Sequence, residues 1–217
     1  MSTSGQGDLA ADKERALALT PVSRETKSRL EKYIDLLLLW QNKFNLVASS
    51  QLPILWTRHV ADSLQLLPLA PAAKTWVDFG SGAGFPGIPI ACALADTPGA
   101  KVHLVESVGK KANFLREVVQ QIGLPAQVHE ERVEKFGDSF TENVDVVTAR
   151  ALAPLKTLCD QALPLIAKGA VGLFPKGQDV AAELTEAAKY WRLEASTVPS
   201  VTSPGSAIVI IRHIAPR

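Results

Sequence analysis

Four glycines and one carboxylate, close together near the middle of the chain, form the segment best suited to bind a nucleotide. The segment runs from Val77 to Gly87 and reads VDFGSGAGFPG. Glycine at such positions lets the backbone adopt positive φ and approach a ligand without a Cβ in the way. Apolar runs at 75–79 and 88–95 flank the loop. They predict a strand, a glycine loop and a helix at the nucleotide-binding edge of an α/β sheet.

Two classes of cofactor fit this loop. The letters GAGFPG match the dinucleotide fingerprint, and Glu106 follows at about the distance expected for an acidic ribose ligand. The alternative is S-adenosyl-L-methionine, which class I methyltransferases bind with a loop of the form acidic-x-Gly-x-Gly-x-Gly. Asp78 favours this alternative, because its carboxylate would repel a diphosphate and attract the cationic amino group of methionine. Pro86 and Pro89 also favour it, since they remove N–H donors that a pyrophosphate needs.

Further candidate residues follow the other predicted strands, because ligands of open α/β sheets lie beyond the carboxyl ends of the strands. Glu106 ends the strand 101–106 and is suited to accept hydrogen bonds from a ribose diol. After the strand 126–129, backbone amides near Val133 and its side chain could flank an adenine. Arg150 follows the strand 143–148 and is expected nearest the transferred methyl group. Lys176 places another cation at the rim, after the strand 171–175.

The residues around Arg150 favour a methyl acceptor that needs no proton removed. Methyltransferases of exocyclic amines usually carry Asn/Asp-Pro-Pro-Tyr/Phe here, whereas this chain has ARALAP. Cys92 and Cys159 lie in apolar helical patterns, so neither suits the nucleophile of pyrimidine C5 methylation. Guanine N7 carries a free lone pair, and alignment alone could supply most of the catalysis. Arginine can also donate two hydrogen bonds to guanine O6 or to phosphate.

The elements that must position these residues belong to one α/β domain with a helical addition. The chain has 217 residues, of which 47% are hydrophobic, enough for a full core. Residues 1–20 are predicted to be a disordered tail, 21–73 a helical N-terminal cap with helices at 23–44 and 51–67, and 74–217 the main domain. Strands and helices alternate from residue 75, and the last two strands, 192–197 and 207–213, are joined by a short connection that favours antiparallel pairing. The predicted fold class is a Rossmann-like, mostly parallel sheet with an antiparallel C-terminal hairpin, as in class I S-adenosylmethionine-dependent methyltransferases.

Composition predicts a cytoplasmic protein without a membrane span, a signal peptide or a bound metal. The net charge of +1 does not indicate a general nucleic-acid binder. Basic residues nevertheless gather at 101–116 and acidic ones at 117–145, which permits a basic face. The alternative is that these are ordinary solvated helix faces, and that Arg58 and His59 pack against Asp62. The candidate RNA-binding residues are Arg58, His59, Lys110, Lys111, Arg116, Arg150 and Lys176.

An ordered set of segments, from about residue 25 to the C-terminus, resembles a known family. The segments are WQNKFNL at 40–46, RHVADS at 58–63, DFGSGAGFPGIP at 78–89, LVESVGKK at 104–111, FLR at 114–116, RVE at 132–134, ARA at 149–151 and KG at 176–177. They resemble the small-subunit ribosomal RNA guanine-N7 methyltransferases, also called the glucose-inhibited division protein B family. The resemblance implies transfer of a methyl group from S-adenosylmethionine to N7 of a guanine in the 530 loop of 16S ribosomal RNA.

The resemblance and the loop together give a set of expected site residues. The partner would be 16S ribosomal RNA or the small ribosomal subunit, and the chain would act as a monomer. Arg150 is the best candidate for positioning the target, and no other catalytic residue is assigned. A nicotinamide-dependent oxidoreductase and a non-catalytic RNA-binding domain remain as alternatives. The expected cofactor-binding residues are Asp78, Gly80, Gly82, Gly84, Phe85, Glu106, Ser107, Val133, Glu134 and Arg150.

Overall fold

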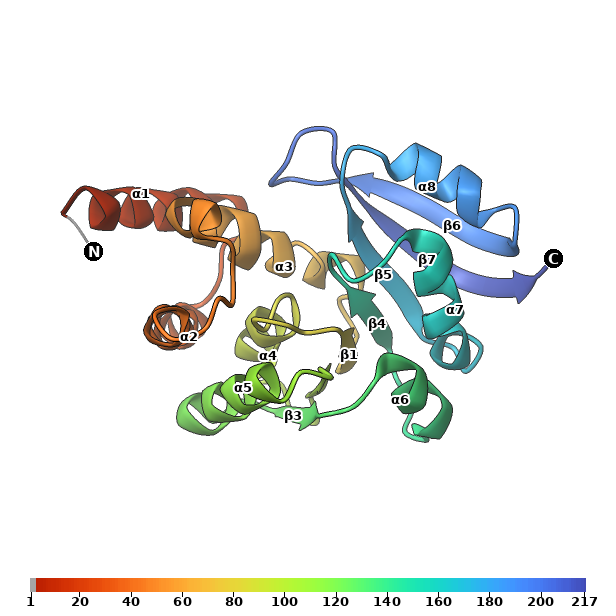
Figure 1. Cartoon of the computed structure of the whole chain (residues 1–217), viewed down its shortest axis with the longest axis horizontal. Coiled ribbons are helices and arrows are strands. Elements are labelled where there is room, and N and C mark those ends of the chain that lie inside the picture. Colours follow the sequence, from red (N-terminus) through yellow and green to blue (C-terminus); the bar gives the residue numbers. More distant parts are fainter. Residues whose placement is uncertain (1–2) are drawn as a thin grey trace.

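A seven-stranded sheet forms the centre of the computed structural model, which describes residues 3–217, with side chains from residue 8 onward (Figure 1). The strand order is β3-β2-β1-β4-β5-β7-β6. Strands β1 to β5 pair in parallel, whereas β7 runs antiparallel to both β5 and β6. This arrangement confirms the predicted fold class. The strands are β1 (Thr75–Phe79), β2 (Lys101–Val105), β3 (Ala126–His129), β4 (Val146–Ala149), β5 (Val171–Lys176), β6 (Trp191–Pro199) and β7 (Ala207–Pro216).

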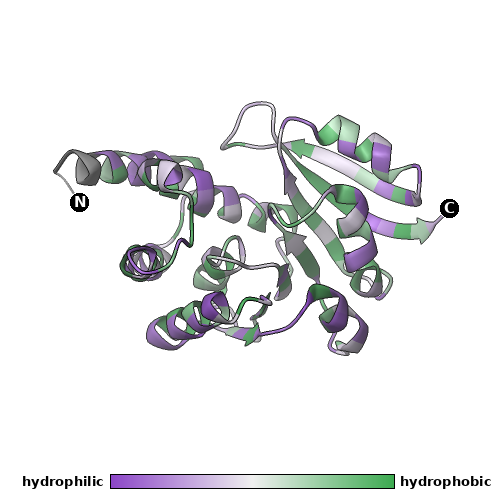
Figure 2. Cartoon of the chain, in the orientation of Figure 1, coloured by the Kyte–Doolittle hydropathy of each residue, from purple (hydrophilic) through white to green (hydrophobic). Residues whose placement is uncertain are grey.

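Two apolar cores lie on opposite faces of the sheet, because successive strand side chains point to opposite sides. Trp76 of β1 belongs to one core, with the N-terminal helices, α4 and α5, and Val77 belongs to the other, with α6, α7 and α8. Figure 2 shows the matching pattern, with apolar central strands and polar residues along the helices. The helices that follow β1 are α4 (Gly87–Leu94), α5 (Gly109–Ile122), α6 (Val133–Ser139), α7 (Leu155–Ile166) and α8 (Val180–Ala187). Among residues 3–217, none of the helices combines the length and the apolar character that a membrane span requires.

The register of the parallel strands brings three predicted site segments to one edge. Phe79 at the end of β1 pairs with Val105 of β2 on one side and with Ala149 of β4 on the other. The next residue in each strand is therefore Gly80, Glu106 or Arg150. These three residues are neighbours because their strands end together.

The N-terminal segment is a helix, α1 (Thr3–Leu19), where the sequence predicted a disordered tail. The polar composition of residues 1–20 was the basis of that prediction, and residues 1–2 lie outside the described part. Asp12 of α1 is fully buried, and its Oδ2 accepts hydrogen bonds from the backbone N–H groups of Trp56 (2.8 Å) and Thr57 (3.0 Å). Its Oδ1 accepts from Thr57 Oγ1 at 2.6 Å. The buried carboxylate thus caps a distant helix, a long-range contact that local composition does not indicate.

Replacing Asp12 with alanine is expected to lower the free energy of unfolding by about 1–3 kcal/mol, because the buried N–H groups would lose their acceptor. Glu14→Ala is the matched control, since Glu14 is exposed on the same helix, and it should change stability by less than about 0.5 kcal/mol. Denaturant unfolding measures both variants. Equal stability of the two would show that Asp12 does not anchor α1.

The rest of the cap consists of one long helix and a chain of short turns. Helix α2 (Arg24–Gln41) has Ser23 as its N-cap, and the side chain of Ser23 accepts a hydrogen bond from Thr26 N. The start of this helix agrees with the predicted helix 23–44, whereas its end lies three residues earlier than predicted. The helix predicted at 51–67 is instead divided among four elements. These are η1 (Ser49–Ile54), the π-helical η2 (Trp56–Ala61), α3 (Asp62–Leu64) and η3 (Leu67–Leu69). Pro53 lies within η1, and the wide turn of η2 is of a rare type that often occurs at functional sites.

Two histidines are packed against each other beneath α6. His103 Nδ1 lies 2.9 Å from His129 Nε2, and the His103 side chain is fully buried beside the rings of Phe136 and Phe140. Burial lowers the pKa of His103 to about 4 and also lowers the pKa of His129. Both rings are therefore neutral in the folded chain near pH 7.

The free energy of unfolding should fall as the pH drops from about 6.5 to about 4, where unfolded His103 binds a proton that the folded chain does not. Above pH 6.5, the ordinary pKa of histidine, this contribution is constant. Denaturant unfolding at about pH 7 and about pH 5, compared between the wild type and His103→Gln, isolates the effect, because other titrating groups are common to both. A smaller fall in the variant is expected, and an identical fall would contradict the assignment.

Candidate functional site

The glycine loop after β1 is held from below by Asp78. Gly80, Gly82 and Gly84 have φ values of +64°, +58° and +103°, in the region that favours glycine. Asp78 is fully buried, and its Oδ2 accepts a hydrogen bond from Gly87 N at 3.0 Å. Its Oδ1 has no hydrogen-bond partner among the residues that the structure describes. Burial raises the pKa of Asp78 to about 7. The carboxylate thus fixes both the loop and the start of α4.

A cavity of about 280 Å³, here called the glycine-loop cavity, opens beside this loop. Most of the residues predicted to bind the cofactor line it: Gly80, Gly82, Glu106, Ser107, Val133, Glu134 and Arg150. The other three, Asp78, Gly84 and Phe85, are not part of the lining, and Asp78 is enclosed under the loop. Lys111, predicted to bind RNA, lies in this lining instead.

Two backbone N–H groups orient the carboxylate of Glu106, which lines the glycine-loop cavity. Its Oε2 accepts from Gly82 N and its Oε1 from Val108 N, each at 2.8 Å. Each carboxylate oxygen can accept a further hydrogen bond, so Glu106 remains able to accept from two adjacent hydroxyl groups. Elsewhere in the lining, Glu134 Oε1 accepts from Gln161 Nε2 at 2.8 Å. Sequence reasoning missed Gln161, because it occupies an unremarkable position within α7.

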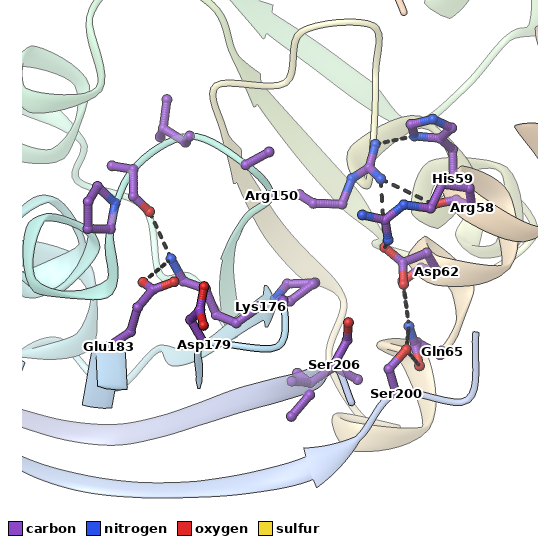
Figure 3. Close-up of a pocket in the computed structure, with 18 of the residues that line it drawn as sticks. Arg58, His59, Asp62, Gln65, Arg150, Lys176, Asp179, Glu183, Ser200 and Ser206 are labelled. Atoms are coloured by element: carbon purple, nitrogen blue, oxygen red, sulfur yellow. Dashed lines mark hydrogen bonds and ion pairs between the residues drawn. The ribbon is translucent and has the colours of Figure 1, made fainter. Parts of the chain in front are cut away.

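A second and larger cavity of about 610 Å³, here called the cap cavity, lies between the cap and the carboxyl edge of β4 and β5 (Figure 3). Four of the predicted RNA-binding residues line it: Arg58, His59, Arg150 and Lys176. The candidates on α5 lie elsewhere. Lys110 Nζ lies 5.4 Å from the centre of the Phe44 ring, and Arg116 forms an ion pair with Glu130 at 2.8 Å.

Arg150 lines both cavities and is held by the cap (Figure 3). Its Nη1 donates to the backbone oxygen of Arg58 at 3.2 Å and lies 3.7 Å from Asp62 Oδ2. Its Nη2 bonds to His59 Nδ1, and the guanidinium lies 5.4 Å from the centre of the Phe85 ring. The side chain is 15% exposed. Burial lowers the pKa of Arg150, and Asp62 counteracts part of that effect.

His59 is a buried partner of Arg150. Burial, together with the charges of Arg150 and Arg58, lowers its pKa to about 3, so the ring is neutral. Since Nδ1 faces a guanidinium donor, the ring proton is on Nε2. His59 therefore orients Arg150 and has no basic nitrogen free to accept a proton.

Lys176 is also committed to internal contacts. Its Nζ lies 2.7 Å from Glu183 Oε2 and donates to the backbone oxygen of Ala153 at 2.8 Å, with the side chain 9% exposed. Glu183 Oε2 also accepts from Leu155 N at 2.6 Å. This group fastens the connection between β4 and α7, within which Ala151 has a φ of +54°. Its compensated charge makes Lys176 a weaker candidate for contacting phosphate than the sequence suggested.

The sequence of the chain matches a family model over residues 26–214, and that model is described as rRNA small subunit methyltransferase G. The chain belongs to this family. A ribosomal RNA small subunit methyltransferase G of Bradyrhizobium sp. strain ORS 278 is 58% identical over 210 residues, covering 97% of this chain and 95% of the relative. A protein of the same name from Rhodopseudomonas palustris strain HaA2 is 56% identical over 215 residues, covering 97% of this chain and 90% of the relative.

Solved structures with the same fold include other methyltransferases. An O-methyltransferase from Bacillus cereus is 14% identical with a TM-score of 0.58, covering 95% of this chain and 99% of that chain. A putative O-methyltransferase from Klebsiella pneumoniae has a TM-score of 0.56 at 14% identity, covering 96% of this chain and 98% of that chain. At such identities the likeness extends to the fold alone. Membership of the rRNA small subunit methyltransferase G family decides the class of enzyme: the chain is a methyltransferase.

Proposed function

We propose that the chain transfers a methyl group from S-adenosylmethionine to N7 of a guanine in the 530 loop of 16S ribosomal RNA. The observation that carries this proposal is the meeting of two cavities at Arg150, Ala151 and Leu152, which line both. One cavity adjoins the glycine loop, and the other is large enough for a nucleobase. Residues of the main domain, 74–217, line the glycine-loop cavity, and residues of the cap complete the lining of the cap cavity. The enzyme acts as a cytoplasmic monomer on ribosomal RNA or the small subunit.

The residues of the glycine-loop cavity fit the cofactor. Glu106 suits the two ribose hydroxyl groups, since it lines the cavity and each of its oxygens, which accepts one backbone N–H, retains acceptor capacity. Val133 offers an apolar surface for the adenine, with Glu134 and Gln161 at the polar end. Gly80 and Gly82 adopt the left-handed backbone conformation and carry no Cβ, so the methionine part of S-adenosylmethionine can approach the backbone there. When bound, S-adenosylmethionine supplies a methyl group on a sulfonium sulfur, which leaves as a neutral thioether.

The groups around the junction favour a target atom that carries its own lone pair. His59 bonds to Arg150 through Nδ1, and Asp62 faces the cations of Arg58 and Arg150. Neither is placed as a free general base, and N7 of guanine requires none. Attack by N7 forms a carbon–nitrogen bond as the carbon–sulfur bond breaks, and it moves one positive charge onto the purine. The paired charges of Arg150 and Asp62 therefore hold and align the reactants. When no proton is transferred, this alignment supplies most of the lowering of the reaction barrier.

Isothermal titration with S-adenosylhomocysteine, first alone and then with small-subunit ribosomal RNA, tests cofactor binding. Transfer of a radiolabelled methyl group to small subunits that lack this modification, followed by mapping of the labelled base, tests the target. Binding together with a label on N7 of one 530-loop guanine is the expected result. A label on another atom or another loop would overturn the target assignment while leaving the enzyme class unchanged.

A further inference from the structure

Leu152 is a large apolar side chain left 37% exposed at the junction of the two cavities. More than a third of this residue's surface therefore gains nothing from burial in the free protein. The contacts that hold Leu152 in place thus keep an apolar surface exposed next to the cofactor site.

The connection that carries Leu152 is held at both ends. Arg150 is bound by the cap, as described above, and Ala153 accepts from Lys176 at 2.8 Å. Between these anchors, Ala151 has a φ of +54°, a conformation that costs free energy for a residue with a Cβ. The strain is consistent with a requirement that the next side chain point in one particular direction.

The direction of Leu152 is set by the glycine loop. A Cβ placed on Gly80 would collide with the Leu152 side chain, so the leucine lies directly against the glycine. It also lines the cap cavity, together with the apolar residues Pro154, Pro175 and Ile208 and the charged residues Lys176, Asp179 and Glu183. The cap residues Arg58, Asp62 and Gln65 lie across this cavity from the ion pair of Lys176 and Glu183 (Figure 3). A purine in this cavity could contact the apolar side chain of Leu152 with its ring face and the surrounding polar side chains with its edges.

We infer that Leu152 is the residue on which the ring of the target base rests, and that it thereby directs N7 toward the methyl group. This inference rests on the proposed function and adds a substrate contact to it. The faces of purine rings are apolar, so contact with Leu152 removes apolar surface of both partners from water. In methyl transfer to N7 the plane of the base must contain the line of attack, and a fixed side chain beneath the ring restricts the orientation of that plane.

The test compares Leu152→Asn, which keeps the approximate shape but is polar, with Leu152→Met, which stays apolar. Leu39→Asn is the matched control, because Leu39 is 64% exposed on α2, outside both cavities. For each variant, kcat and KM for the unmodified small subunit are measured with saturating cofactor, along with the Kd for S-adenosylhomocysteine and the Tm. We expect Leu152→Asn to lower kcat/KM for the subunit about tenfold or more, whereas Leu152→Met and Leu39→Asn stay within about threefold of the wild type. The Kd for S-adenosylhomocysteine should change less than about threefold in all three variants.

Each other outcome has a distinct meaning. Unchanged kcat/KM in Leu152→Asn, with an active wild type, would overturn the inference and leave the proposed function standing. A parallel loss of S-adenosylhomocysteine affinity would also overturn it, since Leu152 would then serve the cofactor. Absence of methyl transfer by the wild type would overturn the proposed function, and the inference with it.

Discussion

Replacing Arg150 with lysine is expected to reduce kcat for methyl transfer by about 100-fold or more, although the charge is retained. The guanidinium contacts Arg58 O, His59 Nδ1 and Asp62 at the same time, and an ammonium group cannot reproduce this planar arrangement. A shift of about 1 Å in aligned reactants can cost such a factor. Steady-state methyl transfer with saturating cofactor and saturating small subunit measures kcat.

Arg192→Lys is the matched control for this substitution, since Arg192 is exposed on β6 and does not line either cavity. It should retain the wild-type rate. If Arg150→Lys also retained it, a positive charge alone would be sufficient at this position, and the geometry described for Arg150 would have no role in catalysis.

The second large effect concerns the loop beneath the cofactor. Asp78→Ala is expected to weaken the binding of S-adenosylhomocysteine about tenfold or more, because Gly87 N would lose its buried acceptor and the glycine loop its anchor. Isothermal titration measures the Kd, and the Tm should fall in the same variant.

Asp78→Asn separates two explanations of this effect. The amide oxygen of asparagine can still accept from Gly87 N, so a loop anchored by this hydrogen bond should keep its affinity within about threefold. The explanation predicted from the sequence is instead that the Asp78 carboxylate attracts the methionine amino group. In that case the neutral asparagine would lose as much affinity as alanine. The enclosed position of Asp78, outside the lining of the glycine-loop cavity, favours the first explanation.

The sequence predicted those parts of the site that follow from local pattern and strand order. Gly80, Glu106 and Arg150 each follow a parallel strand, and parallel strands that end together must place these residues at one edge. The antiparallel hairpin followed from the short connection before β7. These predictions needed no knowledge of which side chains touch.

Contacts between distant segments could not be predicted in the same way. Arg150 bonds to residues about 90 positions earlier in the chain, and no periodicity encodes such a pairing. Lys176 appeared as a free cation because Glu183 is separated from it by a turn and the first part of α8. Helix α1 was missed for a similar reason, since the polar Asp12 is buried only because Trp56 and Thr57 supply its donors.

The reliance of the cap on later parts of the chain has a consequence for synthesis on the ribosome. Tyr33 donates to Ala83 O, Arg29 pairs with Asp96, and Gln65 bonds to Ser200 and Val201 in the loop before β7. The cap emerges first during translation, yet its partners emerge only later, up to the last strands. Domains usually fold as units in the order of their synthesis. Here the part of the cap around Gln65 should remain incompletely packed until residues 200–201 have left the exit tunnel, and a nascent chain stalled before residue 200 should be sensitive to proteases near Gln65.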